Sequence, residues 1–175
     1  MAERFERLYR GYGRFLAVLG VISGLITFGI MWLIVFNSLM RKTLNQPIQG
    51  TYEITESALV LMVFLSLAYT QCRRGHIRVT LLTRHLPMRL QHWLYVTVLM
   101  IGCLFFAWCS YASFGDAAQS YAIGEQEWGL IRFPLWPIRI SIFIGVLLLS
   151  LQYLLDAIRH AFVTAGQLAA LGDEP

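Results

Sequence analysis

Charged residues are scarce in this sequence. Only 14% of its 175 residues are Asp, Glu, Lys or Arg, whereas an ordinary soluble domain carries about 25%. Hydrophobic residues make up 57% of the chain. So little polar surface argues against a soluble enzyme and indicates that the lipid bilayer is the solvent of this protein.

The sequence also lacks the usual marks of catalysis and of metal or cofactor binding. It contains no glycine-rich phosphate loop, no HExxH motif and no paired cluster of metal ligands. Its three cysteines, Cys72, Cys103 and Cys109, imply no disulfide framework. We therefore expect neither enzymatic activity nor a bound cofactor.

Four long apolar stretches alternate with the charged segments. A membrane-spanning helix needs about 20 predominantly apolar residues, and each stretch reaches that length once its flanking turns are included. We predict an all-α integral membrane protein, a single membrane domain over residues 1–175, with short interfacial amphipathic helices at the N-terminus and after the second span. The four transmembrane helices are expected at about residues 15–37, 54–72, 90–114 and 137–156.

The basic residues are distributed unevenly between the two sides of such a protein. Ten of the 14 Lys and Arg fall in the N-terminal segment, the second connection and the C-terminal tail, and four fall on the opposite side. The positive-inside rule relates such an excess to the cytoplasmic side. We therefore expect a multi-pass protein with both termini in the cytoplasm.

Ionisable residues avoid the centres of all four predicted spans. His76, His85, His92 and His160 all fall in connections or at span ends, whereas a haem-binding bundle needs histidines inside facing helices. A pump or exchanger normally carries an ionisable residue in mid-membrane. The chain is therefore not expected to move a charged solute on its own.

Polar residues gather instead at the ends of the spans. Glu56 and, one turn earlier, Glu53 lie at the start of the second span. Glu56 is either an ordinary carboxylate near a helix N-terminus, where negative charge is favoured, or one half of an ion pair. The basic second connection is either a topogenic segment attracted to anionic lipid or a docking surface for another subunit.

A stripe of small residues runs along the first span. It consists of Gly20, Ser23, Gly24 and Thr27 and includes a G-x-x-x-G pattern. Such a face lets another helix approach closely. The approaching helix belongs either to this chain or to a partner.

An ordered series of polar and glycine residues lies between Phe36 and Pro87. Its members are Asn37, Arg41, Asn45, Pro47, Glu56, Arg73 or Arg74, Gly75, His76, Ile77 and Val79. The series resembles the central signature of the DctQ-like small membrane subunits of TRAP transporters, the tripartite ATP-independent periplasmic uptake systems. The four-span topology and the two prolines before the last span, Pro134 and Pro137, agree with that family.

The resemblance implies a non-catalytic small subunit in the bacterial inner membrane. Such a subunit scaffolds a large DctM-like membrane subunit, which holds the sodium and substrate sites. A periplasmic substrate-binding protein then delivers an organic acid, such as a dicarboxylate or a sugar acid, for sodium-coupled uptake. The candidate interface or structural residues are Asn37, Arg41, Glu56, Arg73, Arg74, Gly75, His76, Arg78, Gly20 and Gly24.

Two other functions stay open from the residues alone. One is an independent, oligomeric four-helix exporter, which predicts substrate transport by the purified chain in liposomes. The other is the membrane anchor of a redox complex, which predicts visible absorption by the purified protein.

Charge reversal separates the two interpretations of the basic second connection. If this segment docks another subunit, Arg74→Glu or Arg78→Glu weakens assembly more than Arg7→Glu does, because only the first two place a negative charge in the interface. Co-purification with the large subunit measures the effect. Equal effects at all three positions would favour the topogenic role.

Overall fold

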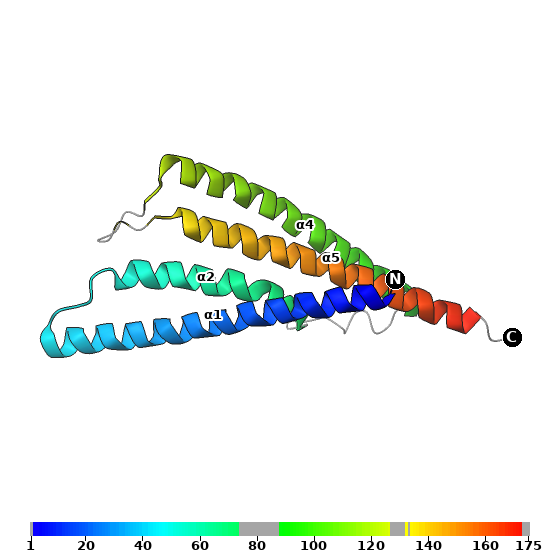
Figure 1. The fold of residues 1–175 in the computed structure, drawn as a ribbon, viewed down its shortest axis with the longest axis horizontal. Helices are drawn as coiled ribbons and strands as arrows, with labels where there is room; N and C mark the ends of the chain where they lie inside the picture. The colour runs from blue at the N-terminus through cyan, green and yellow to red at the C-terminus, as the bar shows by residue number, and fades with distance from the viewer. Residues whose placement is uncertain (1, 74–87, 127–131, 133, 173–175) are drawn as a thin grey trace.

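The fold was obtained as a computed structural model, which describes residues 2–73, 88–126, 132 and 134–172. Side chains are described for residues 5–73, 90, 93–126, 132 and 134–161. Apart from one isolated β-bridge between Gln126 and Pro134, the regular structure of this part is helical. The four long helices are α1 (Ala2–Leu44), α2 (Thr51–Cys72), α4 (Met88–Ile123) and α5 (Trp136–Gly172) (Figure 1). Each helix contains a stretch long and apolar enough to cross a membrane. The predicted all-α membrane fold is confirmed.

Three of the helices are much longer than a bilayer requires. At about 1.5 Å per residue, the 43 residues of α1 extend over about 65 Å, whereas the hydrocarbon core is about 30 Å thick. The helices α4 and α5 contain 36 and 37 residues, and only α2, with 22, is close to the minimum. The long helices must therefore tilt in the membrane or protrude from it.

The N-terminal segment forms part of α1 rather than a separate interfacial helix. Residues 2–14 form the first turns of α1, without a break before the apolar part of the helix. No proline interrupts these turns, and the hydroxyls of Tyr9 and Tyr12 donate hydrogen bonds to α5. The second interfacial helix was expected within residues 74–87, which lie outside the described residues.

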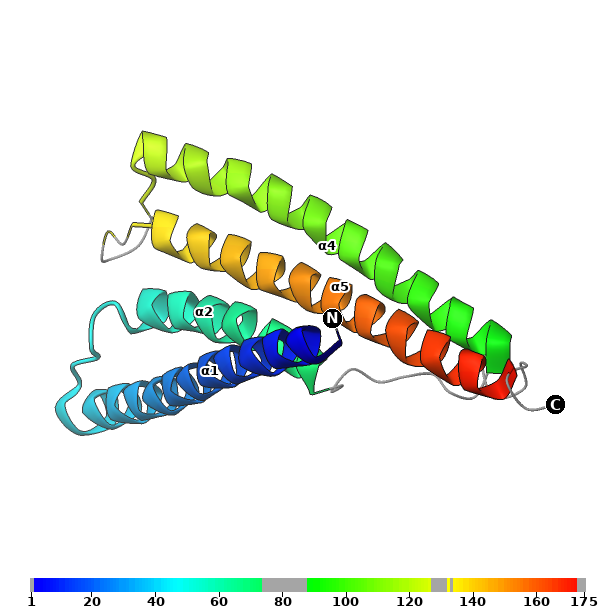
Figure 2. The ribbon, with the colours of Figure 1, turned by 45° about the vertical axis from the view of Figure 1, so that its right-hand side comes forward.

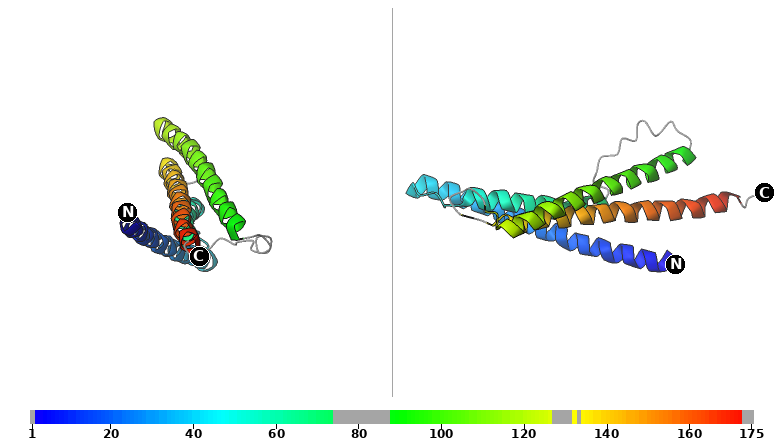
Figure 3. Two further views of the ribbon diagram at one scale, coloured as in Figure 1. Left: turned by 90° about the vertical axis from the view of Figure 1, so that its right-hand side faces the viewer. Right: turned by 90° about the horizontal axis from the view of Figure 1, so that it is seen from above.

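The helices form an open row in the order α1, α2, α5, α4. Among the described residues, α1 packs along α2, α2 along α5 and α5 along α4. The row is narrow where α1 begins and spreads toward the other end, as Figure 2 shows. Seen from above, the helices cross at an angle instead of running parallel (Figure 3). The start of α1 and the end of α5 lie at the same end of the molecule (Figure 1), as an even number of spans requires.

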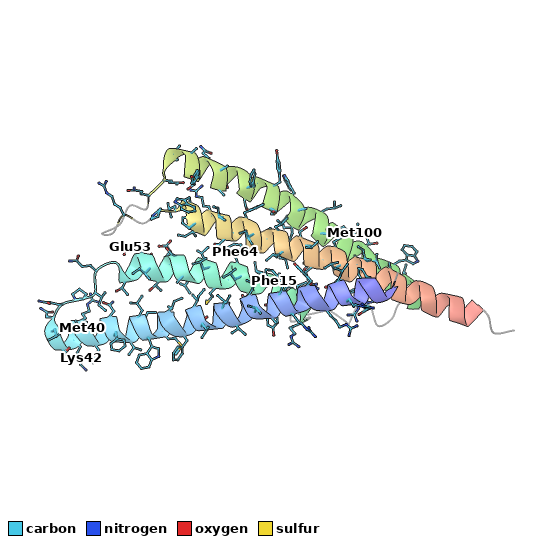
Figure 4. All side chains as sticks on the ribbon, in the orientation of Figure 1. Phe15, Met40, Lys42, Glu53, Phe64 and Met100 are labelled. Atoms are coloured by element: carbon cyan, nitrogen blue, oxygen red, sulfur yellow. The ribbon has the colours of Figure 1, made fainter. Side chains whose placement is uncertain are left out.

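Burial follows the position of each helix in this row. In the most apolar stretch of each helix, 39% of the residues of α5 are buried, against 17% in α2 and 11% in both α1 and α4. A small core is formed by Leu16 of α1, Ala68 of α2 and Leu149 of α5, at the narrow part of the row. Side chains project outward from α1 and α4 over most of their length (Figure 4), so both edges of the row expose apolar surface.

The two halves of the row, α1 with α2 and α5 with α4, approach each other closely at Gly145. A Cβ at this position of α5 would overlap the backbone carbonyl group of Phe64 in α2. Backbone cannot move aside as a flexible side chain can, so only glycine allows α2 and α5 to pack at this distance.

An alanine substitution tests this contact. We expect Gly145→Ala to lower the free energy of unfolding by about 1–3 kcal/mol, the usual effect of overpacking, because the added methyl group forces α2 and α5 apart. The matched control is Gly24→Ala in α1, where an added Cβ meets nothing within 4 Å. Thermal unfolding of the purified chain in detergent measures both. Equal stability of the two variants would contradict the packing seen here.

Candidate functional site

Three helices meet around the carboxylate of Asp156, near the middle of α5. The Tyr9 hydroxyl of α1 donates to Oδ1 at 2.9 Å, and the Gln71 amide of α2 donates to Oδ2 at 3.2 Å. Gln152, one turn earlier on α5, donates its Nε2 to Oδ1 at 2.9 Å. Hydrogen bonds to an ionised carboxylate are roughly twice as strong as neutral ones. These four residues, the Asp156 cluster, therefore join α1, α2 and α5 at one point.

Further contacts hold α1 against α5 beside this cluster. Arg159 Nε lies 3.3 Å from Glu6 Oε1, and the guanidinium carbon lies 4.6 Å from the centre of the Tyr9 ring. The Tyr12 hydroxyl donates to the carbonyl oxygen of Leu148 at 2.6 Å. Glu6, Tyr9 and Tyr12 are three residues apart, so they share one face of α1. That face is bonded to α5 over two helical turns.

The environment of the Asp156 cluster suits a structural role. Gln152 is fully buried, and its Oε1 has no hydrogen-bond partner within the described part of the chain. Those residues contain no group of three or more His, Cys, Asp and Glu side chains that could hold a metal ion. The chemistry available here is the anchoring of helices by a carboxylate with several donors.

The Asp156 cluster was not predicted from the sequence. Asp156 is the last residue of the predicted span 137–156, so its charge was interpreted as marking the end of that span. A signal was available in the spacing of Gln152, Asp156 and Arg159 at i, i+4 and i+7, which places three polar residues along one face of a helix.

Asn37 organises the connection between α1 and α2 at the wide end of the row. Its Oδ1 accepts a hydrogen bond from the backbone N–H of Ile48 at 2.8 Å, and the Thr51 hydroxyl donates to the Ile48 carbonyl oxygen at 2.7 Å. Ile48 directly follows Pro47, whose nitrogen carries no hydrogen. The structure thus brings together two parts of the sequence signature, Asn37 and the segment that contains Asn45 and Pro47.

The two acidic residues at the start of α2 have different environments. Glu53 is buried with 7% of its surface exposed, whereas Glu56, the residue that the signature singled out, is exposed. At the same end of the row Arg139 of α5 forms an ion pair of 2.7 Å with Glu125, which follows α4. This pair ties the connection between α4 and α5 to the first turn of α5.

The basic candidates are spread over both ends of the row. Arg41 is exposed in the last turn of α1. Arg73, which is exposed at the end of α2, donates from Nε to the Tyr69 hydroxyl at 3.1 Å. The structure does not bring these residues together. Arg74, Gly75, His76 and Arg78 lie outside the described residues.

The small-residue stripe of α1 packs against α2 over part of its width. A Cβ at Gly20 would lie 2.8 Å from the Tyr69 ring, and the Ser23 hydroxyl donates to the carbonyl oxygen of Met62 at 2.8 Å. Gly24 has nothing within 4 Å of the position of a Cβ. Gly20 and Ser23 therefore serve contacts within the chain, and Gly24 lies on an open side.

Comparison with known families agrees with the signature. A family model described as tripartite ATP-independent periplasmic transporters, DctQ component, matches residues 30–163, which is well over half of the chain. The matched range contains Asn37, the connection between α1 and α2, and Asp156, and it confirms the resemblance seen in the sequence. No match was found among the curated proteins.

Removal of the Asp156 carboxylate tests the role of the cluster. We expect Asp156→Ala to lower the free energy of unfolding by about 3 kcal/mol, because it leaves the donors of Tyr9, Gln71 and Gln152 without their acceptor. Tyr9→Phe, which removes one donor, should lower it by about 1 kcal/mol. Unfolding of the purified full-length chain in detergent measures both.

The control for this test is Asp116→Ala, the same substitution at an exposed position of α4, with an expected change within about 0.5 kcal/mol. A double variant of Tyr9 and Asp156 should be less destabilised than the sum of the single variants, because the two side chains share one hydrogen bond. If Asp156→Ala and Asp116→Ala are equally harmless, the cluster does not hold the helices together.

Proposed function

The chain belongs to the family of DctQ components of tripartite ATP-independent periplasmic transporters, and on this premise we propose that it is the small membrane subunit that scaffolds a large, DctM-like permease subunit. In this proposal the large subunit holds the sodium and substrate sites. A periplasmic binding protein delivers an organic acid, and the small subunit keeps the large one in place in the bacterial inner membrane. The family is a class of transporter components and not of enzymes.

The open row of helices is the observation that carries the scaffold role. Both edge helices have only 11% of their apolar stretches buried, so most of their apolar surface is available to lipid or to another membrane protein. Hydrogen bonds at the Asp156 cluster, at Asn37 and between Ser23 and Met62 join segments of the chain to one another. This combination favours a scaffold whose exposed edge helices support a neighbouring subunit.

The distribution of ionisable residues supports a subunit that does not itself transport. The centres of the predicted spans contain no Asp, Glu, Lys, Arg or His, whereas residues that move ions or protons across a membrane usually lie there. Asp156 lies at the edge of its predicted span and accepts hydrogen bonds from three side chains.

The excess of basic residues supports an orientation with the narrow end of the row in the cytoplasm. The start of α1 and the end of α5 lie at that end (Figure 1). In this orientation the Asp156 cluster lies toward the cytoplasm, and Asn37 and the Glu125–Arg139 ion pair lie toward the periplasm.

Co-expression with the neighbouring genes tests the scaffold role. A tagged chain should extract from the membrane together with a large multi-span subunit, and organic-acid uptake into liposomes should require both membrane subunits, the binding protein and a sodium gradient. Extraction of the chain alone from such cells, or transport by the chain alone, would contradict the proposal.

Site-specific cross-linking extends this test to the two edges of the row. Leu25 of α1 and Leu104 of α4 have the same exposed fraction, 67% each, so they are matched positions for a cysteine-reactive or photoactivated probe. A scaffold predicts that a probe on at least one of these edges cross-links to the large subunit. A probe on α5 at buried Val146 is the negative control.

A further inference from the structure

The outward face of α1 carries arginines at one end and apolar residues along the rest. We define the α1 outer stripe as Arg7, Arg10, Arg14, Val18, Val21, Leu25, Phe28 and Trp32. The three arginines are exposed, and the exposed fractions of Val21, Leu25 and Phe28 are 64%, 67% and 58%. At 3.6 residues per turn these positions fall on one side of the helix.

The opposite side of α1 is the one that packs within the chain. Leu16, Ser23 and Ile30 repeat every seven residues and are all buried. The stripe therefore faces away from α2 and α5. Its basic part precedes the range matched by the family model, which begins at residue 30.

Gly11 leaves a bare patch among the arginines of the stripe. Arg7 lies four residues before it and Arg14 three residues after it, so both flank it on the helix surface. A Cβ at Gly11 would meet nothing within 4 Å. A small anionic group therefore has room to lie against the helix beside Arg10 and Arg14.

Arg10 and Arg14 have no acidic partner among the described residues. Neither forms an ion pair in that part of the chain, and Arg10 Nε donates only to the backbone carbonyl of Glu6, one turn earlier, at 3.3 Å. Arginine forms paired hydrogen bonds with phosphate oxygens. The charge of this patch is thus available to a phosphate group from outside the chain.

We infer that the α1 outer stripe binds an anionic phospholipid, with its phosphate at Arg10, Gly11 and Arg14 and an acyl chain along Val18, Val21 and Leu25. Phe15, labelled in Figure 4, directly follows Arg14 in the sequence and begins the apolar part of α1. From Arg14 to Leu25 the helix rises by about 16 Å, about half the hydrocarbon thickness of a bilayer. One leaflet therefore covers this part of the stripe.

The combination of charge and apolar surface favours a lipid over a soluble anion or a protein. A soluble phosphate uses the arginines but leaves the apolar residues unexplained. A protein helix on this face would have to bring acidic side chains to the level of the headgroups. An anionic phospholipid satisfies both parts of the stripe with one molecule.

Lipid titration followed by native mass spectrometry tests the inference. The sample is the full-length chain in detergent, together with any large subunit that co-purifies, and the probes are phosphatidylglycerol and phosphatidylcholine of the same acyl composition. We expect tighter retention of phosphatidylglycerol. In Arg10→Gln/Arg14→Gln the apparent Kd for phosphatidylglycerol should rise on the order of 30-fold, because each basic residue near the headgroups contributes separately.

Two further variants make the experiment specific. Arg41→Gln/Lys42→Gln removes two charges from the other end of the same helix and should leave the high-affinity lipid in place. Gly11→Leu keeps all the arginines but fills the bare patch, and it should weaken phosphatidylglycerol binding.

Equal retention of the two lipids, or unchanged phosphatidylglycerol binding in Arg10→Gln/Arg14→Gln, would overturn the inference. The inference would also be overturned if Arg10→Gln/Arg14→Gln lost a co-purifying protein while its lipid retention stayed unchanged. That result would assign the stripe to a protein partner. The lipid measurement can be made on the chain with or without a large subunit. A negative result for lipid binding is therefore distinguishable from failure of the scaffold proposal.

Discussion

The carboxylate of Asp156 is the point on which the arrangement of the helices depends. It accepts hydrogen bonds from Tyr9 of α1 and Gln71 of α2 as well as from Gln152 of its own helix. A partly buried charge is tolerated only when enough donors surround it, so these side chains and their helices are held in one register. Together with the close approach of α2 and α5 at Gly145, this junction positions α1 and α2 against α5.

The sequence was sufficient to predict the helices, since predominantly apolar stretches of about 20 residues have few structures available in a bilayer, and the ordered signature between Phe36 and Pro87 was sufficient to predict the family. It was not sufficient to predict the open row. Apolar residues surround α1 and α4 on nearly all sides, so periodicity does not tell a face that meets a neighbouring helix from one that meets lipid. The position of Gly145 against the Phe64 backbone depends on how two helices cross, which no spacing rule provides.

The candidate site was predicted in part, for reasons that particular residues make clear. Asn37 and Pro47 were identified from their order along the chain, and the structure adds the reason for that order, the hydrogen bond from Ile48 to Asn37. Glu56 was preferred over Glu53 because it fits the signature, yet the buried residue is Glu53. Which of the two is buried depends on the rotation of α2 about its axis, and that rotation is set by tertiary packing. Asp156 was missed because a charged residue at the edge of an apolar stretch can simply mark the end of a span. The sequence does not distinguish that role from a contact between helices.

The lengths of the helices restrict the membrane in which such a row fits. The helix α2 is about 33 Å long, near the minimum for a span, and it lies between α1 and α5, which are far longer. Its two ends carry the exposed charged residues Glu56 and Arg73. A thicker bilayer would draw these charges into hydrocarbon, whereas α1 and α5 could adapt by changing their tilt. Hydrophobic mismatch at the shortest helix therefore sets the membrane thickness that the whole row tolerates.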